Sequence, residues 1–183
     1  MPTVRVLRRL LVDKALGSDY IGEPLCKASH MIAACKNAKA KREPEEIILA
    51  CLFHDIGHLL APDDTGGFGV ANHAELGAAL LKGLGMPDRT CDAVRQHVNA
   101  KRYMVGSDPY YKLSEASRAT LAFQGGPMTC GLERYRFKIH PAFADAMAVR
   151  AHDDTSKEKT LTRVEVCEAF DEFTPMIIRH CVV

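Results

Sequence analysis

A histidine and an aspartate stand side by side within an apolar segment, and this pair constrains the fold more than any other feature of the sequence. The pair is His54 and Asp55, and the residues around it, from Cys51 to His58, are mostly apolar. An ionised carboxylate in such surroundings needs a cation or several hydrogen-bond donors, because burying it alone is unfavourable. Together the two side chains offer metal ligands at neighbouring positions. The sequence therefore predicts a fold that buries this pair at a metal site.

The composition is that of a single folded domain. The chain has 183 residues, of which 47% are hydrophobic, enough for one core and too few for two ordinary domains. We therefore expect one domain over residues 1–183. The formal net charge is +1, with 24 Lys and Arg against 23 Asp and Glu. Such a balance gives no sign of a nucleic-acid partner, so any anionic ligand must be bound by local charges.

The cysteines and the N-terminal segment indicate the compartment. The seven cysteines are odd in number and contain no Cys-x-x-Cys pair, which favours reduced thiols in a cytosol-like environment. Arginines and an aspartate interrupt the apolar residues at the N-terminus, so this segment predicts neither a signal peptide nor a membrane-spanning helix. We expect a cytoplasmic protein without a membrane partner.

Apolar residues recur at three- and four-residue spacings almost throughout, and no segment alternates as a strand does. The sequence therefore predicts an all-α fold, a single compact helical bundle. The expected helices cover residues 4–16, 24–39, 45–60, 73–84, 87–99, 115–123, 141–153 and 162–179. The last begins with Thr162 and has Glu165 three residues later, a capping-box pattern. A glycine-rich loop at 63–69 lacks the Gly-Lys-Ser/Thr ending of a phosphate-binding loop, so we expect a flexible connection there.

Further histidines and aspartates complete a set of candidate metal ligands. They are His30 upstream of the pair, His73 and His97 downstream, and the adjacent Asp153 and Asp154. The order His, His-Asp, His, His, Asp resembles the HD-domain superfamily, in which helices project these side chains into a central metal site. The resemblance covers about residues 20–157. A structural role is the commoner one for any single histidine, whereas the ordered set points to metal binding.

A tyrosine and a glutamate before the first histidine narrow the resemblance. Tyr20 and Glu23 precede His30, as a Tyr-x-x-Glu element does in the HD-domain oxygenases that have a mixed-valent di-iron centre, especially the phosphonate-cleaving ones. In that branch the tyrosine occupies an iron position until substrate displaces it, and the glutamate contacts the amino group of the substrate. A phosphohydrolase of the same superfamily needs neither residue.

The resemblance implies two iron ions, as Fe(II) and Fe(III), and dioxygen as a co-substrate. One iron would have four protein ligands: His30, His54, Asp55 and Asp153. Asp55 would bridge to the second iron, whose further ligands would be His73, His97 and, at rest, Tyr20. The resemblance favours Asp153 over Asp154 as the carboxylate ligand.

The resemblance also implies a pocket for a small-molecule phosphonate. Lys101 and Arg150 lie one helical turn from candidate ligands, so each would bring a positive charge to the site. With Ser117 as a hydrogen-bond donor, they look like the phosphonate-binding residues of that branch. His58 looks like the histidine that reaches the substrate without binding a metal, and Glu23 would select an amino or quaternary ammonium end.

The resemblance implies an enzyme that oxidatively cleaves the carbon–phosphorus bond of a small α-hydroxyphosphonate. The resemblance suggests 2-amino-1-hydroxyethylphosphonate or its N-trimethyl analogue, with phosphate and glycine or glycine betaine as products. In that branch a glutamine stands three residues after the first histidine, where this chain has Ala33, so the choice of substrate stays open.

Two alternatives to an oxygenase remain at this point. One is a metal-dependent phosphohydrolase that acts on a phosphate monoester or a nucleotide, and the other is a catalytically inactive metal-binding or interaction domain. Imidazole and carboxylate ligands suit manganese, zinc or cobalt as well as iron. Only the tyrosine and the resemblance favour iron.

Overall fold

A computed structural model describes the chain apart from residues 20–24, 68, 157–159 and 182–183. Within the described residues the regular elements are helices, and the one β-type contact is an isolated bridge between Asp19 and Cys26. The predicted all-α class is therefore confirmed. No helix in the described part of the chain is long and apolar enough to cross a membrane.

The elements follow one another along the chain as short helices joined by turns and loops. In order they are α1 (Pro2–Arg8), the π-helix η1 (Arg9–Ala15), α2 (Lys27–Ala40), α3 (Glu45–Phe53), the 3-10 helix η2 (Ile56–Leu59), α4 (His73–Gly83), α5 (Asp88–Ser107), α6 (Glu115–Leu121), α7 (Gly131–Lys138), α8 (Phe143–Asp154) and α9 (Arg163–His180). The predicted capping box at the start of α9 is present, with both of its hydrogen bonds.

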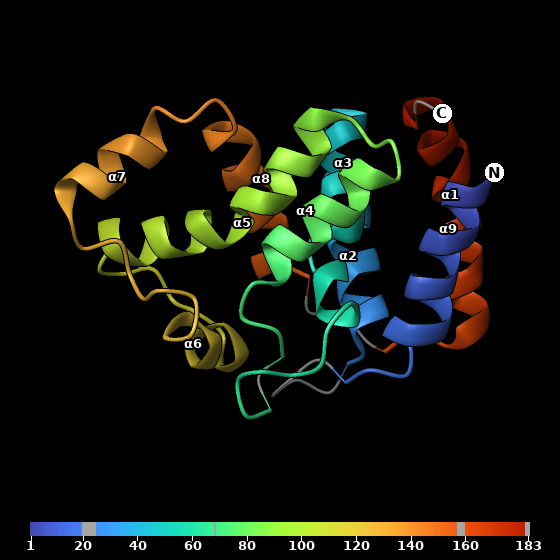
Figure 1. Cartoon of the computed structure of the whole chain (residues 1–183), viewed down its shortest axis with the longest axis horizontal. Coiled ribbons are helices and arrows are strands. Elements are labelled where there is room, and N and C mark those ends of the chain that lie inside the picture. The colour runs from blue at the N-terminus through green and yellow to red at the C-terminus, as the bar shows by residue number, and fades with distance from the viewer. Residues whose placement is uncertain (20–24, 68, 157–159, 182–183) are drawn as a thin grey trace.

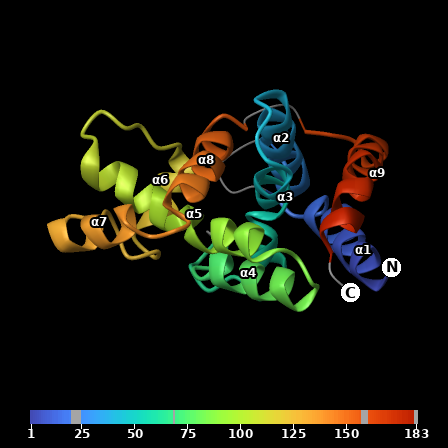
Figure 2. The ribbon, with the colours of Figure 1, turned by 90° about the horizontal axis from the view of Figure 1, so that it is seen from above.

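The helices are arranged along one long direction. In Figures 1 and 2, α2 and α3 lie in the middle, α1 and α9 lie side by side at one end, and α6 and α7 lie at the other. Helix α5 packs against α3, α4 and α8, and it also contacts α7. It therefore links the middle of the molecule to the end that carries α6 and α7.

The apolar core has a large and a small part. The large cluster joins α1, η1, α2, α3, η2, α4 and α9 with residues of α5 and α8, and its fully buried side chains include Leu11, Phe53 and Phe170. The small cluster lies between α5, α7 and α8, where the rings of Phe137 and Phe143 pack with their centroids 5.2 Å apart. These clusters hold the middle helices from two sides.

The predicted helix over 45–60 is broken in the structure. The α-helix ends at Phe53, and a 3-10 helix begins at Ile56, with His54 and Asp55 in the turn between them. A Cβ atom on Gly57 would lie 1.9 Å from the backbone oxygen of His73. The backbones of η2 and α4 therefore approach so closely that only glycine fits, and this contact sets the direction of the chain after the His-Asp pair.

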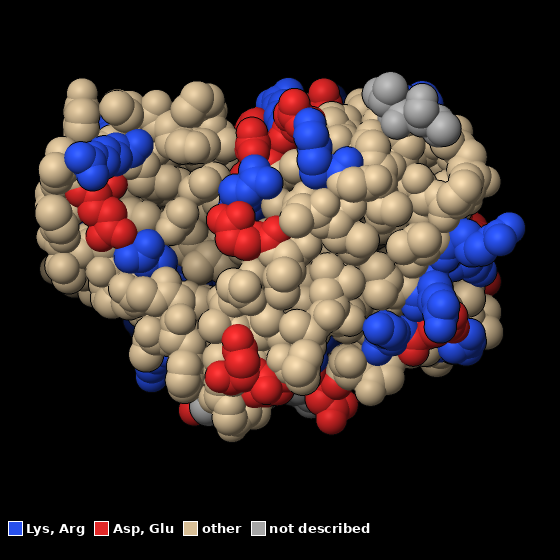
Figure 3. All heavy atoms as spheres, viewed as in Figure 1, with Lys and Arg blue, Asp and Glu red and all other residues tan. Residues whose placement is uncertain are grey.

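Helix α7 was not predicted, and α5 is longer than the predicted 87–99 helix. Within α7 only Phe137 is buried, whereas Leu132 and Tyr135 are exposed. Such a short helix shows no clear apolar periodicity, so its position depends on the small cluster. Charged side chains of both signs are interspersed over the face shown in Figure 3, in keeping with the balanced composition.

Candidate metal centre

Six of the predicted ligand side chains meet in the middle of the bundle. They are His30 in α2, His54 and Asp55 after α3, His73 at the start of α4, His97 in α5 and Asp153 near the end of α8. All six are buried, and none is more than 6% exposed. Residues up to 123 positions apart in the sequence (His30 and Asp153) thus share one small volume.

Four of these side chains form a first group: His30, His54, Asp55 and Asp153. Nε2 of His30 lies 3.0 Å from Oδ1 of Asp153 and 3.2 Å from Nε2 of His54. Oδ2 of Asp55 lies 3.5 Å from Nε2 of His54. Atoms that bind one ion at about 2.1 Å lie about 3 Å apart when they meet it at right angles, so this spacing suits a shared metal ion.

The other two histidines form a second group with the opposite side of Asp55. Nε2 of His73 lies 3.2 Å from Nε2 of His97. Oδ1 of Asp55 lies 3.4 Å from Nε2 of His73 and 3.7 Å from Nε2 of His97. The two oxygens of Asp55 thus face different groups, which is the placement that lets one carboxylate bridge two ions.

The second ring nitrogen of each ligand histidine faces a backbone carbonyl. The distances from Nδ1 to the oxygen lie between 2.7 and 3.2 Å, and the pairs are His97 with Val94, His54 with Cys51, His73 with Val70, and His30 with Ser156. In these pairs Nδ1–H donates to the carbonyl, so Nε2 keeps its lone pair for a metal. Such partners fix both the tautomer and the orientation of ligand imidazoles.

His58 is close to the second group but has the opposite tautomer. Its ring stacks on that of His73 with centroids 3.9 Å apart, and its Nε2 lies 4.0 Å from Oδ1 of Asp55. The backbone N–H of Val70 donates to Nδ1 of His58 over 3.0 Å. In the neutral ring Nε2 must then carry the proton. A ring nitrogen that carries a proton cannot bind a metal, so this geometry is in keeping with the prediction that His58 binds no metal, and its contact with the substrate stays a prediction.

The loop that brings Val70 to His58 is fastened by a carboxylate. Oδ1 of Asp63 accepts hydrogen bonds from the backbone N–H groups of Thr65 and Gly67, and Oδ2 accepts one from Gly69 over 2.6 Å. These bonds lower the pKa of Asp63 to about 2. Asp63 thus holds the turn that positions Val70, and the flexibility expected of this loop stays a prediction.

The charge state of the cluster suits metal binding. Burial lowers the pKa values of His54 and His73 and lowers that of His58 to about 4. Burial alone would raise the pKa of Asp55, but the surrounding histidines, His54 first, lower it well below its usual range. For His30 the effect of burial is outweighed by Asp153, so its pKa is raised. Ionised carboxylates beside mostly neutral imidazoles are the forms that bind a metal.

The two adjacent aspartates point to different partners. Oδ1 of Asp153 faces His30, and Oδ2 of Asp153 accepts a hydrogen bond from Nη1 of Arg150 over 2.5 Å. Asp154 instead accepts hydrogen bonds from Nη2 of Arg150 and from the hydroxyl of Tyr111. The geometry thus favours Asp153 as the ligand, in line with the prediction.

Two buried cations lie beside the ligand cluster. Lys101 and Arg150 are each 4% exposed. Nζ of Lys101 donates to Oγ1 of Thr120 over 3.0 Å, and Nη2 of Arg150 donates to Oγ of Ser117 over 3.4 Å. Burial and then the charge of Arg150 lower the pKa of Lys101 to about 8. No ion pair joins Lys101 to a carboxylate among the described residues, whereas Arg150 is paired with Asp153 and Asp154. The ammonium of Lys101 is therefore the buried charge that suits an anion best.

The predicted site residues and those that the structure brings to the site differ in part. Tyr20 and Glu23 lie outside the described residues, so their roles as iron ligand and substrate contact stay predictions. The sequence did not indicate Thr120 or Ser156, nor the contact of Tyr111 with Arg150. Oγ of Ser156 donates to the carbonyl of Asp153 over 2.6 Å and lies 3.0 Å from Nδ1 of His30. No spacing rule singles out a serine or threonine for such a role.

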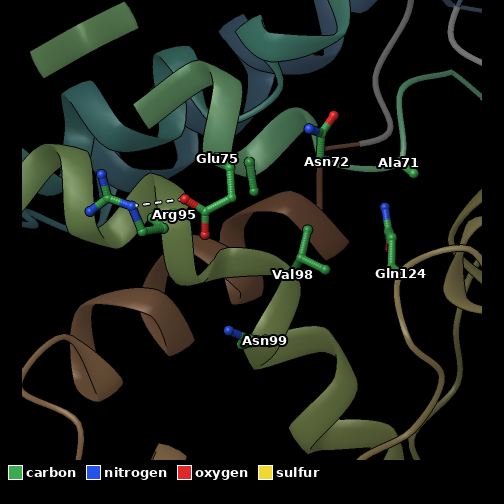
Figure 4. A pocket seen from close by; sticks show the side chains of 8 residues that line it. Ala71, Asn72, Glu75, Arg95, Val98, Asn99 and Gln124 are labelled. Atoms are coloured by element: carbon green, nitrogen blue, oxygen red, sulfur yellow. Dashed lines mark hydrogen bonds and ion pairs between the residues drawn. The ribbon is translucent and has the colours of Figure 1, made fainter. Parts of the chain in front are cut away.

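A separate pocket opens at the surface between α4, α5 and the segment after α6 (Figure 4). It has a volume of about 110 Å³ and is lined by Ala71, Asn72, Ala74, Glu75, Arg95, Val98, Asn99 and Gln124. Glu75 and Arg95 form an ion pair across it at 3.1 Å. Among the described residues, none of the predicted site residues lines this pocket, although Asn72 and Val98 are the sequence neighbours of His73 and His97.

Most of the ligand cluster lies in a segment that matches a known family. Residues 26–128, over half of the chain, match the profile of the HD domain. The chain belongs to the HD-domain family.

Individual relatives extend this similarity over most of the chain. A 1-hydroxy-2-(trimethylamino)ethylphosphonate dioxygenase (glycine-betaine-forming) of Leisingera caerulea is 36% identical over 177 residues, which cover 92% of this chain and 86% of the relative. A hydroxymethylphosphonate dioxygenase of Gimesia maris is 32% identical over 166 residues, 82% of each chain. An uncharacterized protein of Acanthamoeba polyphaga mimivirus is 40% identical over 153 residues, 80% of this chain and 69% of the relative.

Proposed function

We propose that this protein is a di-iron oxygenase that uses dioxygen to cleave the carbon–phosphorus bond of a small α-hydroxyphosphonate. The observation that carries the proposal is the pair of buried cations, Lys101 and Arg150, beside a carboxylate that faces two groups of metal ligands. The names of the two relatives with an assigned activity support the same reaction. One has a trimethylammonium group in its named substrate and the other does not, so the proposal is confined to the α-hydroxyphosphonate unit that they share.

The residues present fit a dinuclear centre. Four imidazoles with carbonyl-bonded Nδ1 atoms and two ionised carboxylates supply nitrogen and oxygen ligands of the kind that iron accepts. The first ion would be held by His30, His54, Asp55 and Asp153, and the second by Asp55, His73, His97 and the predicted ligand Tyr20. Bound there, iron would supply the redox chemistry that dioxygen activation requires.

The surrounding side chains would bind and orient the substrate. The ammonium of Lys101 and the guanidinium of Arg150 would neutralise the phosphonate, and in a buried pocket such charged hydrogen bonds are stronger than at the surface. Ser117 would donate to a phosphonate oxygen. Nε2–H of His58 points toward the carboxylate between the two groups and would donate to the substrate there. Glu23 is proposed to contact a positively charged far end.

The overall reaction balances without any other reductant. The substrate carbon loses its bonds to hydrogen and phosphorus and gains one oxygen, becoming a carboxylate. The phosphorus gains the other oxygen and leaves as phosphate. The carbon gives up four electrons, dioxygen takes up all four, and one proton is released. Both added oxygen atoms are thus accounted for by dioxygen.

The test is phosphate release by the iron-loaded protein, with and without dioxygen. The panel holds hydroxymethylphosphonate, 2-amino-1-hydroxyethylphosphonate and its N-trimethyl analogue, together with phosphate monoesters and a nucleotide. Oxygen-dependent phosphate from at least one hydroxyphosphonate is expected. Release that needs no oxygen and comes only from the monoesters or the nucleotide would make the protein a phosphohydrolase instead.

Matched variants test whether phosphate release depends on this ligand cluster. Asp55→Asn removes the carboxylate that faces both groups, and it should abolish release. Asp88→Asn changes an aspartate that is 74% exposed and paired only with Lys82 among the described ion pairs. Equal activity in the two variants would contradict the proposal.

A further inference from the structure

The guanidinium of Arg150 is held at all three of its nitrogens. Nε donates to the hydroxyl oxygen of Tyr111 over 2.9 Å, and Nη1 donates to Oδ2 of Asp153 over 2.5 Å. Nη2 donates to Asp154 and, over 3.4 Å, to Ser117. A guanidinium has five N–H groups, so four have partners among the described residues. The remaining one is on Nη1, the nitrogen that also faces the predicted ligand Asp153.

Tyr111 and Asp154 close a ring of hydrogen bonds with this guanidinium. The hydroxyl of Tyr111 accepts from Nε of Arg150 and donates to Oδ2 of Asp154, while Oδ1 of Asp154 accepts from Nη2. Burial is the main cause that raises the pKa of Tyr111 to about 12, so the hydroxyl keeps its proton at neutral pH. A planar guanidinium that donates hydrogen bonds from both Nε and Nη2 is held in one orientation.

The ring connects two separate parts of the fold. Asp154 is the last residue of α8, whereas Tyr111 lies in the segment that leads from α5 into α6. Helix α6 carries Ser117 and Thr120, which contact Arg150 and Lys101. Tyr111 and Asp154 thus orient the guanidinium of Arg150. Their hydrogen bonds also fix the segment that leads into α6, and α6 carries the hydroxyl groups of Ser117 and Thr120.

We propose that Tyr111 and Asp154 are positioning residues of the phosphonate pocket, which act by holding Arg150. This inference rests on the proposed function. The ring directs the remaining Nη1–H of Arg150 to the side of Asp153, where the metal centre lies. The contact of Nη2 with Ser117 is at the long limit for a hydrogen bond. The hydroxyl of Ser117 can therefore turn to a phosphonate oxygen when the substrate enters, while the guanidinium keeps its orientation.

The test compares Tyr111→Phe with Tyr110→Phe in the iron-loaded protein. Tyr110 is 87% exposed, so its variant is a matched control. Loss of the Tyr111 hydroxyl frees one side of a charged hydrogen-bond network, and KM for the hydroxyphosphonate should rise about tenfold. The value of kcat should change less than about threefold, because the lost contact orients binding in ground and transition state alike. Iron content and melting temperature should match those of the control.

A second variant keeps the inference testable if Tyr111→Phe fails to fold. Asp154→Asn keeps an acceptor oxygen but removes the charge, and it should raise KM in the same direction. In the double variant the rise in KM should be smaller than the product of the two single effects, because both residues act through one guanidinium. A rise equal to the product would overturn the shared mechanism.

The outcomes separate this inference from the function on which it rests. If the unaltered protein releases no phosphate from any hydroxyphosphonate, the proposed function fails and the inference falls with it. If the unaltered protein is active and Tyr111→Phe has the KM of Tyr110→Phe, only the inference fails. A variant that loses iron or stability while its KM is unchanged would show a structural role and would also overturn it.

Discussion

At the scale of single residues, Asp55 lies buried between the two groups of candidate ligands. Its oxygens lie 3.4 Å from His73 and 3.5 Å from His54, on opposite sides of one carboxylate. The adjacent His54 is fully buried and is oriented by the carbonyl of Cys51. His54 thus belongs to the first group of ligands, whereas Asp55 faces both groups. This is the arrangement expected of a bridging carboxylate.

Removal of the bridge should therefore remove both ions. In Asp55→Ala the two groups lose their shared ligand, and the iron content of the loaded protein should fall from about two ions per chain to nearly none. His97→Ala, which touches the second group alone, should keep about one ion. Metal analysis after gel filtration measures both. Retention of two ions by Asp55→Ala would contradict the bridge.

Lys101 gives the pocket a pH dependence of defined sign. Burial is the main cause that lowers its pKa to about 8, so the ammonium is present below that pH and is lost above it. The value of kcat/KM for a hydroxyphosphonate reports the free protein, and it should fall about tenfold per pH unit above this pKa. In Lys101→Arg the charge persists, and the alkaline decline should disappear.

The control for this profile is Lys112→Arg, a change at an exposed lysine. The substrate's own ionisation is the same for every variant and cancels in the comparison. An alkaline decline that is unchanged in Lys101→Arg would show that another group causes it.

At the scale of elements, the close contact between η2 and α4 determines how the ligands meet. A Cβ atom on Gly57 would lie 1.9 Å from the oxygen and 2.7 Å from the carbonyl carbon of His73. These are backbone atoms of a residue that is itself a predicted ligand. They cannot move without displacing its side chain.

Gly57→Ala should accordingly disturb both stability and metal binding. The forced separation of η2 and α4 should lower the free energy of unfolding by about 2–3 kcal/mol and should weaken iron binding by the second group. Gly83→Ala is the control, because nothing lies within 4 Å of a Cβ atom at this position in α4. Denaturant unfolding and metal titration measure the two effects. Equal stability of the two variants would refute this account of the helix break.

The same contact shows what the sequence can and cannot reveal. Apolar spacing predicted the all-α class and most helices, because amphipathic periodicity is local. It predicted an unbroken helix over 45–60, since the break depends on a contact between Gly57 and a residue 16 positions away. Helix α7 was missed for a similar reason, because only Phe137 of that helix is buried.

For the site, the order of histidines and aspartates indicated which side chains to bring together. The structure brings all six together, with Lys101, Arg150, Ser117 and His58 next to them. The carbonyl partners of the imidazoles and the ring of Tyr111 and Asp154 were not predictable. Three of the carbonyls lie three residues before their histidine, but a three-residue spacing alone does not show which way an imidazole turns. The carbonyl of Ser156 and the ring arise where distant segments meet. Tyr20 and Glu23 stay predictions.

At the scale of the whole molecule, the ligand cluster lies between the large apolar core and the end that carries α6 and α7. The helices of the large core supply most ligands, while α6, at the other end, supplies the hydroxyl groups of the anion pocket. Charges of both signs are interspersed over the face shown in Figure 3. We therefore expect recognition of an anion to depend on the buried cations at this junction, Lys101 and Arg150.

In the proposed reaction, dioxygen and not water supplies the oxygen that is added when the carbon–phosphorus bond breaks. The most direct measurement incubates the iron-loaded protein with the panel of α-hydroxyphosphonates under dioxygen labelled with heavy oxygen, in ordinary water. Mass spectrometry then follows the carboxylate and phosphate. Heavy oxygen in these products is the predicted result. Products that carry heavy oxygen only when the water is labelled would show hydrolysis and would contradict the proposed function.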